Sequence, residues 1–342
     1  MQVYLEFDIW RIYCKECGKV MQEQFKWLAK HPATSKRFGR YVGERCINSS
    51  ISAVSKELGL DWKTVKEMEK EYMRTQIDRA PEPGPRVIGI DEISIKKGHE
   101  YRIVVSDLEE KRPIWFGGKD RSKESLDEFY DWLGKDKSER IRLSVMDMWK
   151  AFTTSTRTKA KNSAILYDKF HVIRHLNEAL DRIRRSEYRR LAGSEEGRFI
   201  KGQRYSLLSR EKNLEYEAKK SLDLMLSKNK RLYTAYILKE SFEQMWGYKY
   251  EGAARNFFEK WKESLEGQEL KAYEKFAEMI ESHWDGIAAY CKEENKVSLG
   301  FVEGLNNKIR VIQRRAYGLR DPEYIRLKVL SCMLPPLKPS DE

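Results

Sequence analysis

The sequence has no long apolar run and only five cysteines. None of its apolar stretches approaches the roughly 18 residues that a membrane span requires. The opening segment MQVYLEFDIWR also lacks the apolar core of a signal peptide. The cysteines are scattered, apart from Cys14 and Cys17, as is typical of reduced thiols in the cell interior. We therefore expect a cytoplasmic protein with no membrane partner.

Acidic residues are fewer than basic ones. The 342 residues include 66 Lys and Arg against 54 Asp and Glu, which gives a net charge of +12. A hydrophobic content of 40% and a charged content of 35% indicate a globular chain with a core shared between two or three domains. The excess positive charge suggests a polyanion, nucleic acid first and an acidic membrane surface second, although a basic protein without such a partner fits too.

Only one Cys-x-x-Cys knuckle is present, at Cys14 and Cys17 in residues 1–30. A zinc ribbon needs two such knuckles, because a closed tetrahedral site takes four ligands. We interpret residues 1–30 as a partial zinc-ribbon-like segment on a turn between short strands. Its two cysteines are candidate zinc ligands without a complete set.

Residues 31–80 have helical periodicity. Gly59 lies in a tight turn, and Asp61 stands where the next helix would need an N-cap. The pattern is typical of a helix-turn-helix, whose second helix presents side chains to a DNA groove. The candidate DNA contacts are Trp62, Lys63, Thr64 and Lys66. An ordinary helical hairpin is the alternative.

A proline-rich linker, residues 80–86, separates this region from a β-branched one. Strands are predicted at 87–95, 101–108, 113–119, 141–149 and 163–172, helices at 121–135 and 172–185, and a helix or turn at 150–161. These elements indicate a mixed α/β sheet over residues 86–185.

Strand signals are missing from residues 186–295, which we predict to be a helical insertion. Residues 296–342 then provide a C-terminal helix and tail. The basic run that precedes the insertion includes Arg184 and Arg185, and it is either a solvated helix face or a track for DNA.

Three acids stand out. Asp91 and Asp147 each end an apolar strand, where sites of α/β sheets are built, and Glu303 is the single acid at the head of a basic helix. Two carboxylates side by side repel unless a cation lies between them, and oxygen ligands favour Mg²⁺ or Mn²⁺. With Glu303 they would complete a two-metal site for phosphoryl transfer. Helix capping and the helix dipole are the alternative explanations.

Basic residues follow Glu303 on the same predicted helix. They would grip the DNA backbone whose phosphate the metals activate, while the lone acid faces the metal. These candidate DNA contacts are Lys308, Arg310, Arg314 and Arg315.

Four stretches resemble the DDE transposases of bacterial insertion sequences, specifically the ISL3 family. They are GIDEISIKKGHEYRIVVSDL, SVMDMWKAF, LYDKFHVIRHLNEALDRIRR and FVEGLNNKIRVIQRRAYGLRDPEYIRLKV. The resemblance implies an RNase H-like catalytic domain split by a helical insertion and preceded by a helix-turn-helix domain. It also implies that Asp91, Asp147 and Glu303 form the DDE triad. Relatives begin with a full zinc ribbon, which leaves open a truncated or naturally short copy and casts doubt on zinc binding.

The activity that the resemblance implies is cleavage of insertion-sequence ends followed by strand transfer into target DNA, with two Mg²⁺ or Mn²⁺ ions. The partners would be transposon ends and target DNA, bound by a homodimer or larger assembly at the bacterial nucleoid. The rivals are a structure-selective nuclease on the same fold and a catalytically silent DNA-binding regulator or element remnant.

Three further residues have supporting roles to be decided by structure. Asp168 and His171 form an Asp-x-x-His that resembles a signature of several DDE families. Asp168 could compete with Asp147 as the second acid, but we expect the fifth strand to lie farther along the fold than that acid, which favours a structural or DNA-positioning role. We interpret His171 as a hydrogen-bonded core histidine and not as a ligand. Trp149 follows Asp147 and could stack on an unpaired base, although packing in the core is the stronger interpretation.

Overall fold

The computed structural model of the chain describes residues 5–23, 25–29, 34–96, 100–297, 300–316 and 321–338. The chain divides into two compact units, one formed by Met1–Glu82 with Asn307–Glu342 and the other by Pro83–Asn306. The first boundary falls in the predicted linker. Over the described ranges, no helix combines the length and the apolar character needed to cross a membrane.

The first unit begins with a hairpin of β1 (Arg11–Tyr13) and β2 (Val20–Gln22), paired antiparallel. Cys14 and Cys17 lie in the turn between the two strands, as predicted. The turn is closed by the Cys14 amide, which donates to the Lys19 carbonyl at 2.9 Å, and by the Gly18 amide, which donates to the Cys14 carbonyl at 2.9 Å.

Three helices follow, α1 (Lys36–Asn48), α2 (Ile51–Leu58) and α3 (Trp62–Arg79). Gly59 ends α2 with a φ of 65°, and the Asp61 side chain caps α3, so the predicted helix-turn-helix is confirmed. Their shared core contains the buried side chains Val42, Cys46, Val54, Val65 and Met68.

The C-terminal helix α16 (Pro322–Ser331) belongs to this unit and packs on α3. Tyr72 and Met73 of α3 form a second apolar cluster with Tyr324 and Leu327 of α16. The contact also contains a buried carboxylate, Glu69 of α3, which accepts hydrogen bonds from the Tyr324 hydroxyl and the Lys328 ammonium. The predicted C-terminal segment 296–342 is therefore shared between the two units.

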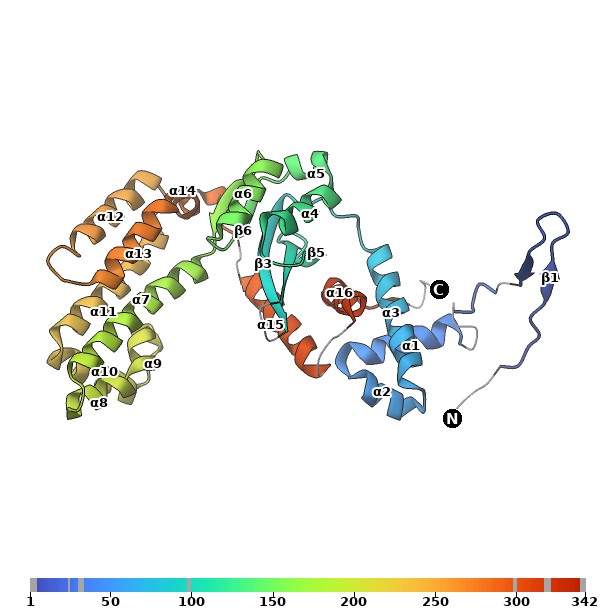
Figure 1. Cartoon of the computed structure of the whole chain (residues 1–342), viewed down its shortest axis with the longest axis horizontal. Coiled ribbons are helices and arrows are strands. Elements are labelled where there is room, and N and C mark those ends of the chain that lie inside the picture. Colours follow the sequence, from blue (N-terminus) through green and yellow to red (C-terminus); the bar gives the residue numbers. More distant parts are fainter. Residues whose placement is uncertain are drawn as a thin grey trace. The chain divides into compact units, whose positions relative to one another are not determined.

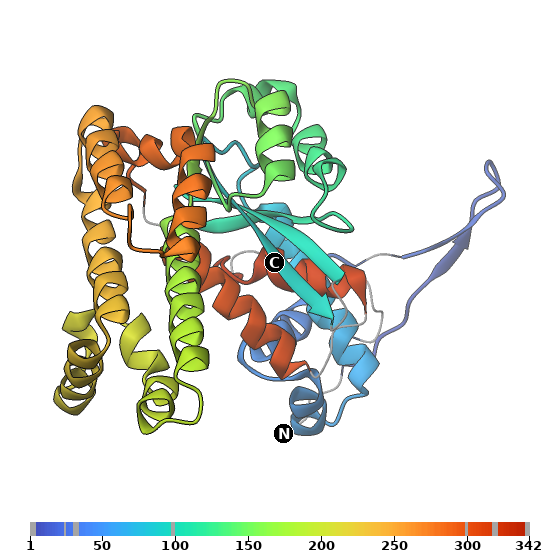
Figure 2. The ribbon, with the colours of Figure 1, turned by 60° about the vertical axis from the view of Figure 1, so that its left-hand side comes forward.

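The second unit is built on one five-stranded sheet in the order β5–β4–β3–β6–β7 (Figures 1 and 2). β3 pairs antiparallel with β4 and parallel with β6; β4–β5 is antiparallel and β6–β7 parallel. The strands are β3 (Val87–Lys96), β4 (Glu100–Asp107), β5 (Arg112–Gly117), β6 (Leu143–Met146) and β7 (Ala164–Tyr167). The order and the mixed pairing are those of an RNase H-like domain, as predicted.

Alternate side chains of β3 enter two different apolar clusters, because successive residues of a strand point to opposite faces. Ile88 and Ile90 pack in the cluster that holds α4 (Lys123–Leu133), whereas Val87 packs in a cluster with Val302. Helix α4, capped by Ser122, packs against α6 (Lys150–Lys159), and the short α5 (Lys135–Glu139) follows α4.

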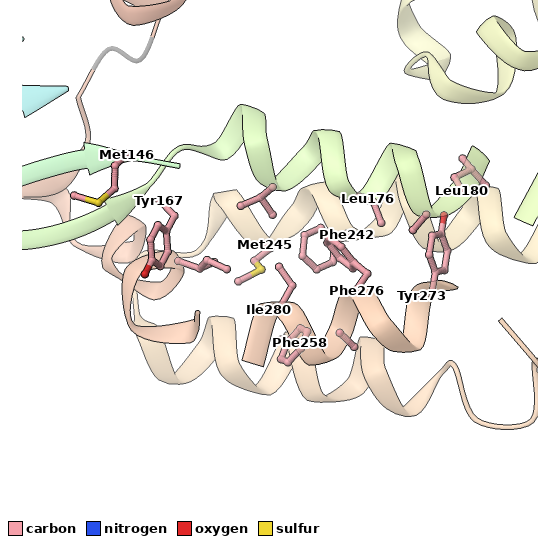
Figure 3. Packing of buried hydrophobic residues seen from close by; sticks show 14 of the residues in the cluster. Met146, Tyr167, Leu176, Leu180, Phe242, Met245, Phe258, Tyr273, Phe276 and Ile280 are labelled. Atoms are coloured by element: carbon pink, nitrogen blue, oxygen red, sulfur yellow. The ribbon is translucent and has the colours of Figure 1, made fainter. Parts of the chain in front are cut away.

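The predicted insertion is helical throughout its described part and packs against the long helix α7 (Lys169–Arg190). Its apolar interior places Leu176 and Leu180 of α7 beside Phe242, Tyr273 and Phe276 (Figure 3). The remaining helices are α8 (Glu195–Gly202), α9 (Arg204–Leu208), η1 (Glu211–Asn213), α10 (Tyr216–Lys228), α11 (Lys230–Phe242), η2 (Glu243–Gly247), α12 (Glu251–Glu263), α13 (Lys271–Ser282), α14 (Trp284–Ala288), η3 (Ala289–Cys291), η4 (Glu293–Asn295) and α15 (Gly300–Arg315).

Candidate active site

Three aspartates lie next to one another across three neighbouring strands of the sheet. β3 and β6 pair with Gly89 opposite Val145, and β6 and β7 pair with Met146 opposite Tyr167. Continuing both registers places Asp91, Asp147 and Asp168 side by side on neighbouring parallel strands. The prediction that Asp91 ends its strand is wrong, because β3 runs on to Lys96 in its antiparallel pairing with β4. Asp91 instead stands where the parallel partner β6 stops.

The side chains also share one face. Val87, Val145 and Leu166 belong to one apolar cluster, and Asp91, Asp147 and Asp168 each lie an even number of residues farther along the same strands. Glu92 lies on the opposite face, where it pairs with Arg121 at 2.9 Å. The sheet therefore places three aspartates on the face that carries this apolar cluster.

Asp147 is held by a histidine. Its Oδ2 lies 3.0 Å from Nδ1 of His171 in the first turn of α7, and its Oδ1 accepts a hydrogen bond from the Met148 amide at 2.6 Å. Burial opposes ionisation of Asp147, but the hydrogen bond and charge of His171 outweigh it and lower the pKa of the carboxyl. The same contact raises the pKa of His171 to about 9. His171 is thus a hydrogen-bonded partner of the site.

Asp91 is the more deeply buried acid. Its Oδ1 accepts from the Glu92 amide at 2.7 Å, and its Oδ2 accepts from the side-chain amide of Asn306 on α15. Burial raises the pKa of Asp91, and the nearby charge of Asp147 adds to this effect. Two neighbouring carboxylates with incomplete compensation are the arrangement that a bound cation would relieve.

Asp168 has a structural contact of its own. Its carboxylate caps α7 by accepting from the Phe170 amide at 2.8 Å, and its own amide donates to the Met146 carbonyl at 2.9 Å. The expectation that the fifth strand lies farther along the fold than the second acid is wrong, because β7 is the direct neighbour of β6. The cap explains an aspartate here, because an N-cap needs a short side chain with a hydrogen-bond acceptor.

Helix α15 packs on the aspartate face of β3. A Cβ on Gly89 would lie 2.9 Å from Cγ2 of Val302, so only glycine allows this approach. Four residues farther along the helix, Asn306 contacts Asp91, which lies two residues after Gly89. A helix rises about 6 Å in four residues and a strand about 6.6 Å in two, so the two contacts align α15 with β3.

Glu303 stands between these two contacts on α15. It lies three residues before Asn306, a spacing that makes the two side chains neighbours on the helix surface. The Glu303 side chain is exposed. The structure therefore brings its helix to Asp91 but does not gather its carboxylate with the other acids.

The donors at this site suit a hard divalent cation. Within the described ranges no three His, Cys, Asp or Glu side chains form a metal-binding group. Asp91 and Asp147 nevertheless offer carboxylate oxygens, and Oδ1 of Asn306 is buried without a hydrogen-bond partner. Carboxylate and amide oxygens are the ligands that Mg²⁺ and Mn²⁺ accept.

An exposed aromatic residue borders the site. Trp149 is 42% exposed, so the interpretation of a core residue is wrong. Its indole nitrogen donates to the Arg121 carbonyl at 2.7 Å, and the Arg121 guanidinium lies 5.0 Å from its ring and 4.3 Å from the Tyr101 ring. These contacts hold the indole at the surface two residues after Asp147.

The predicted DNA contacts of the first unit converge. Residues from the helix-turn-helix and from the end of α15 line one cavity of about 820 Å³ within this unit. Trp62 and Lys63 are exposed at the start of α3, whereas Lys66 pairs with Asp321 at 2.8 Å. The predicted contacts that line the cavity are Trp62, Lys66, Lys308 and Arg315. Thr64 is half-buried, and Arg310 and Arg314 are exposed.

The two arginines predicted as DNA contacts on α7 differ in their exposure to solvent. Arg184 is buried and pairs with Asp181 at 2.8 Å, so its guanidinium is not presented to solvent. Arg185 contacts the same aspartate at 2.6 Å, but its side chain is 59% exposed. The sequence pattern did not separate them, because Asp181 lies one turn before both and only the packing of α7 decides which of the two is buried.

The candidate zinc ligands Cys14 and Cys17 are free thiols on the hairpin turn. Hydrogen bonds from the Cys17 backbone and side chain lower the pKa of Cys14. Cys46 is buried in the helix-turn-helix core and is not available to complete a site with them.

Comparison with known proteins places the chain among transposases. A family model described as a transposase (DDE, ISL3) matches residues 88–329. The chain belongs to the ISL3 family of DDE transposases. A model described as the helix-turn-helix domain of transposase family ISL3 matches residues 23–73. The family assignment agrees with the five-stranded sheet and the helix-turn-helix seen in the structure.

Two relatives extend over most of the chain. It is 31% identical to the transposase for insertion sequence element IS1001 of Bordetella parapertussis, over 93% of this chain and 78% of that protein. It is 27% identical to the transposase for insertion sequence element IS1557 of Mycobacterium tuberculosis, over 94% of this chain and 77% of that protein.

Two residues of the candidate site, Asn306 and Gly89, were not predicted from the sequence. Asn306 carried a usable signal, because it lies one helical turn after Glu303. Gly89 carried none, since a glycine within a strand has several explanations and only the packing of α15 selects one.

Proposed function

We propose that this ISL3 transposase cleaves the ends of its insertion sequence and joins them to target DNA, with Asp91, Asp147 and Glu303 as its catalytic acids. The observation that supports this most strongly is the shared level and face of Asp91 and Asp147 on neighbouring parallel strands. Helix α15, which carries Glu303, packs on that same face.

The three acids would hold two Mg²⁺ or Mn²⁺ ions. When bound, such ions lower the pKa of the attacking oxygen and stabilise the charge that develops on the transferred phosphate. The protein's part is to hold the acids in place. His171 orients Asp147 through a 3.0 Å contact, and Asn306 holds Asp91 through its side-chain amide.

Binding and positioning of DNA would fall to the first unit. Trp62, Lys63 and Thr64 stand at the start of α3, the part of a recognition helix that enters a groove. The cationic residues at the end of α15 would neutralise backbone phosphates without reading the sequence. These are Lys308, Arg310, Arg314 and Arg315, and Arg185 is a further candidate in the second unit.

Transposition joins two ends to one target, so we propose that the chain acts as a homodimer or a larger assembly on DNA. A catalytically silent regulator is the second candidate function. The observation that favours it is that Glu303 is exposed and that no three acidic, histidine or cysteine side chains form a metal-binding group in the described part of the chain.

The decisive experiment uses labelled insertion-end DNA with Mg²⁺ or Mn²⁺. The unmodified chain should nick the ends and then form joined products, whereas nicking alone would indicate a nuclease and bound but uncut DNA a regulator. Asp147→Ala should bind DNA normally and lose cleavage. Asp136→Ala is the control, because Asp136 is exposed on α5. Equal cleavage by the Asp147 variant and the control would remove Asp147 from the site.

A further inference from the structure

The two polar atoms of the Asn306 side chain differ, because only one of them makes a hydrogen bond. Its Nδ2 donates to Oδ2 of Asp91, while its Oδ1 is buried and accepts no hydrogen bond from any described residue. An amide oxygen carries two lone pairs, and a buried acceptor that makes no contact is costly and rare. This oxygen belongs to the residue that contacts Asp91, and Asp147 lies beside Asp91 on the neighbouring strand.

The surroundings of this oxygen favour a cation over a further hydrogen-bond donor. Asp91 and Asp147 both lie on the α15 face, and among the described residues their ion pair is the contact of His171 with Asp147. Packing of Val302 against Gly89 holds α15 against β3, so Asn306 is carried on a fixed element. A hard cation accepts amide oxygens beside carboxylates.

We propose that Asn306 supplies Oδ1 as an oxygen ligand to the divalent cation bound by Asp91, in addition to contacting Asp91 through Nδ2. This inference rests on the proposed function. The competing explanation is that Asn306 only positions Asp91 by donating a hydrogen bond. The two roles demand different atoms, an acceptor oxygen for a ligand and an N–H donor for a positioning residue.

Substitution by aspartate separates the two roles. Asn306→Asp keeps an oxygen at this place and adds charge, but it cannot donate to Asp91 when ionised. A ligand role predicts Mn²⁺ binding at least as tight as in the unmodified chain, together with a lower unfolding temperature without metal and a larger rise when Mn²⁺ is added. A positioning role predicts weaker Mn²⁺ binding, because Asp91 is then repelled and released.

The measurement is a Mn²⁺ titration of the full chain, with free Mn²⁺ followed by electron paramagnetic resonance and unfolding temperature recorded in parallel. We expect Asn306→Ala to weaken binding by about tenfold or more, or about 1.4 kcal/mol. The matched controls are Asn307→Ala and Asn307→Asp, because Asn307 is the exposed neighbour. They should change Mn²⁺ affinity by less than about threefold, under 1 kcal/mol.

The outcomes distinguish this inference from the proposed function. Weakened binding in both Asn306→Ala and Asn306→Asp, with loss of binding in Asp147→Ala, would overturn the ligand role and leave the active site in place. No Mn²⁺ binding by the unmodified chain, or unchanged binding in Asp147→Ala, would overturn both. Weakened binding in Asn306→Ala alone would support the ligand role.

Discussion

Substitution of Gly89 tests whether the approach of α15 to β3 builds the active site. A methyl group at this position would lie 2.9 Å from Cγ2 of Val302 and 3.0 Å from Cδ2 of Leu108. Carbon atoms pack at about 3.5–4.0 Å, so Gly89→Ala forces a displacement of roughly 0.5–1 Å. Val302 cannot turn aside easily, because a β-branched side chain in a helix is held to one rotamer.

This displacement should lower both the unfolding free energy and the rate of cleavage. Overpacking of this kind costs about 1–3 kcal/mol of unfolding free energy. Because α15 carries Glu303 and Asn306, a displacement near 1 Å can also lower the rate of cleavage by about 100-fold. Catalysis should therefore suffer more than folding does. DNA binding should remain, since the helix-turn-helix belongs to the other unit.

The assay pairs urea unfolding with the initial rate of insertion-end cleavage. Val302→Ala removes the atom that the new methyl group meets, so the double variant with Gly89→Ala should regain at least about 1 kcal/mol of the lost stability and part of the lost rate. Gly252→Ala is the matched control, because a Cβ there meets no atom within 4 Å.

Full cleavage by Gly89→Ala would refute the reasoning, since α15 would then not depend on this close approach. Equal losses in the single and double variants would refute the assignment of the clash to Val302. A loss of DNA binding would show that the substitution acts by unfolding the chain.

Three further predictions concern the surface residues. Trp149→Ala should slow cleavage by about tenfold, since one base stacked on an aromatic ring contributes about 1–3 kcal/mol. Trp132 is similarly exposed and should tolerate alanine. Equal cleavage rates in the two variants would contradict a stacking role for Trp149. The pKa of Asp321 is lowered to about 2 by the hydrogen bond from Lys66. Its stabilisation is therefore present above pH ~4 and lost as the pH falls towards 2, so Asp321→Asn should cost about 1 kcal/mol at pH 7 and nothing near pH 2 in urea unfolding. Lys63→Ala should weaken DNA binding and reduce the salt slope by about 1, as measured by fluorescence anisotropy; an unchanged slope would place Lys63 off the DNA.

Local signals predicted the elements well. Gly59 and Asp61 marked the turn and the cap of the helix-turn-helix, because a left-handed residue and an N-cap each need particular side chains. The strand predicted at 87–95 matches β3, but the interpretation of Asp91 as the end of its apolar part was wrong. A charged residue in an apolar run reads as an end, yet pairing with β4 carries the strand to Lys96.

Long-range contacts could not be predicted in the same way. Lys66 fits the pattern of a free cation for DNA, but it pairs with Asp321 on the segment leading to α16. The partner of Arg184 is local, Asp181 one turn earlier on α7, and it is the burial of this guanidinium that only packing decides. A basic pattern shows how many charges a helix carries and not which of them remain exposed.

The sequence by itself determined the family and the strand and helix types, because periodicity, caps and motifs are properties of neighbouring residues. Only the tertiary structure decided that Asp91, Asp147 and Asp168 stand level on three strands, that Val302 rests on Gly89 and that Asn306 reaches Asp91. The reason is physical. Strand register and the approach of a helix to a sheet depend on packing between segments up to 215 residues apart, as in the Asn306–Asp91 contact, which no local pattern encodes.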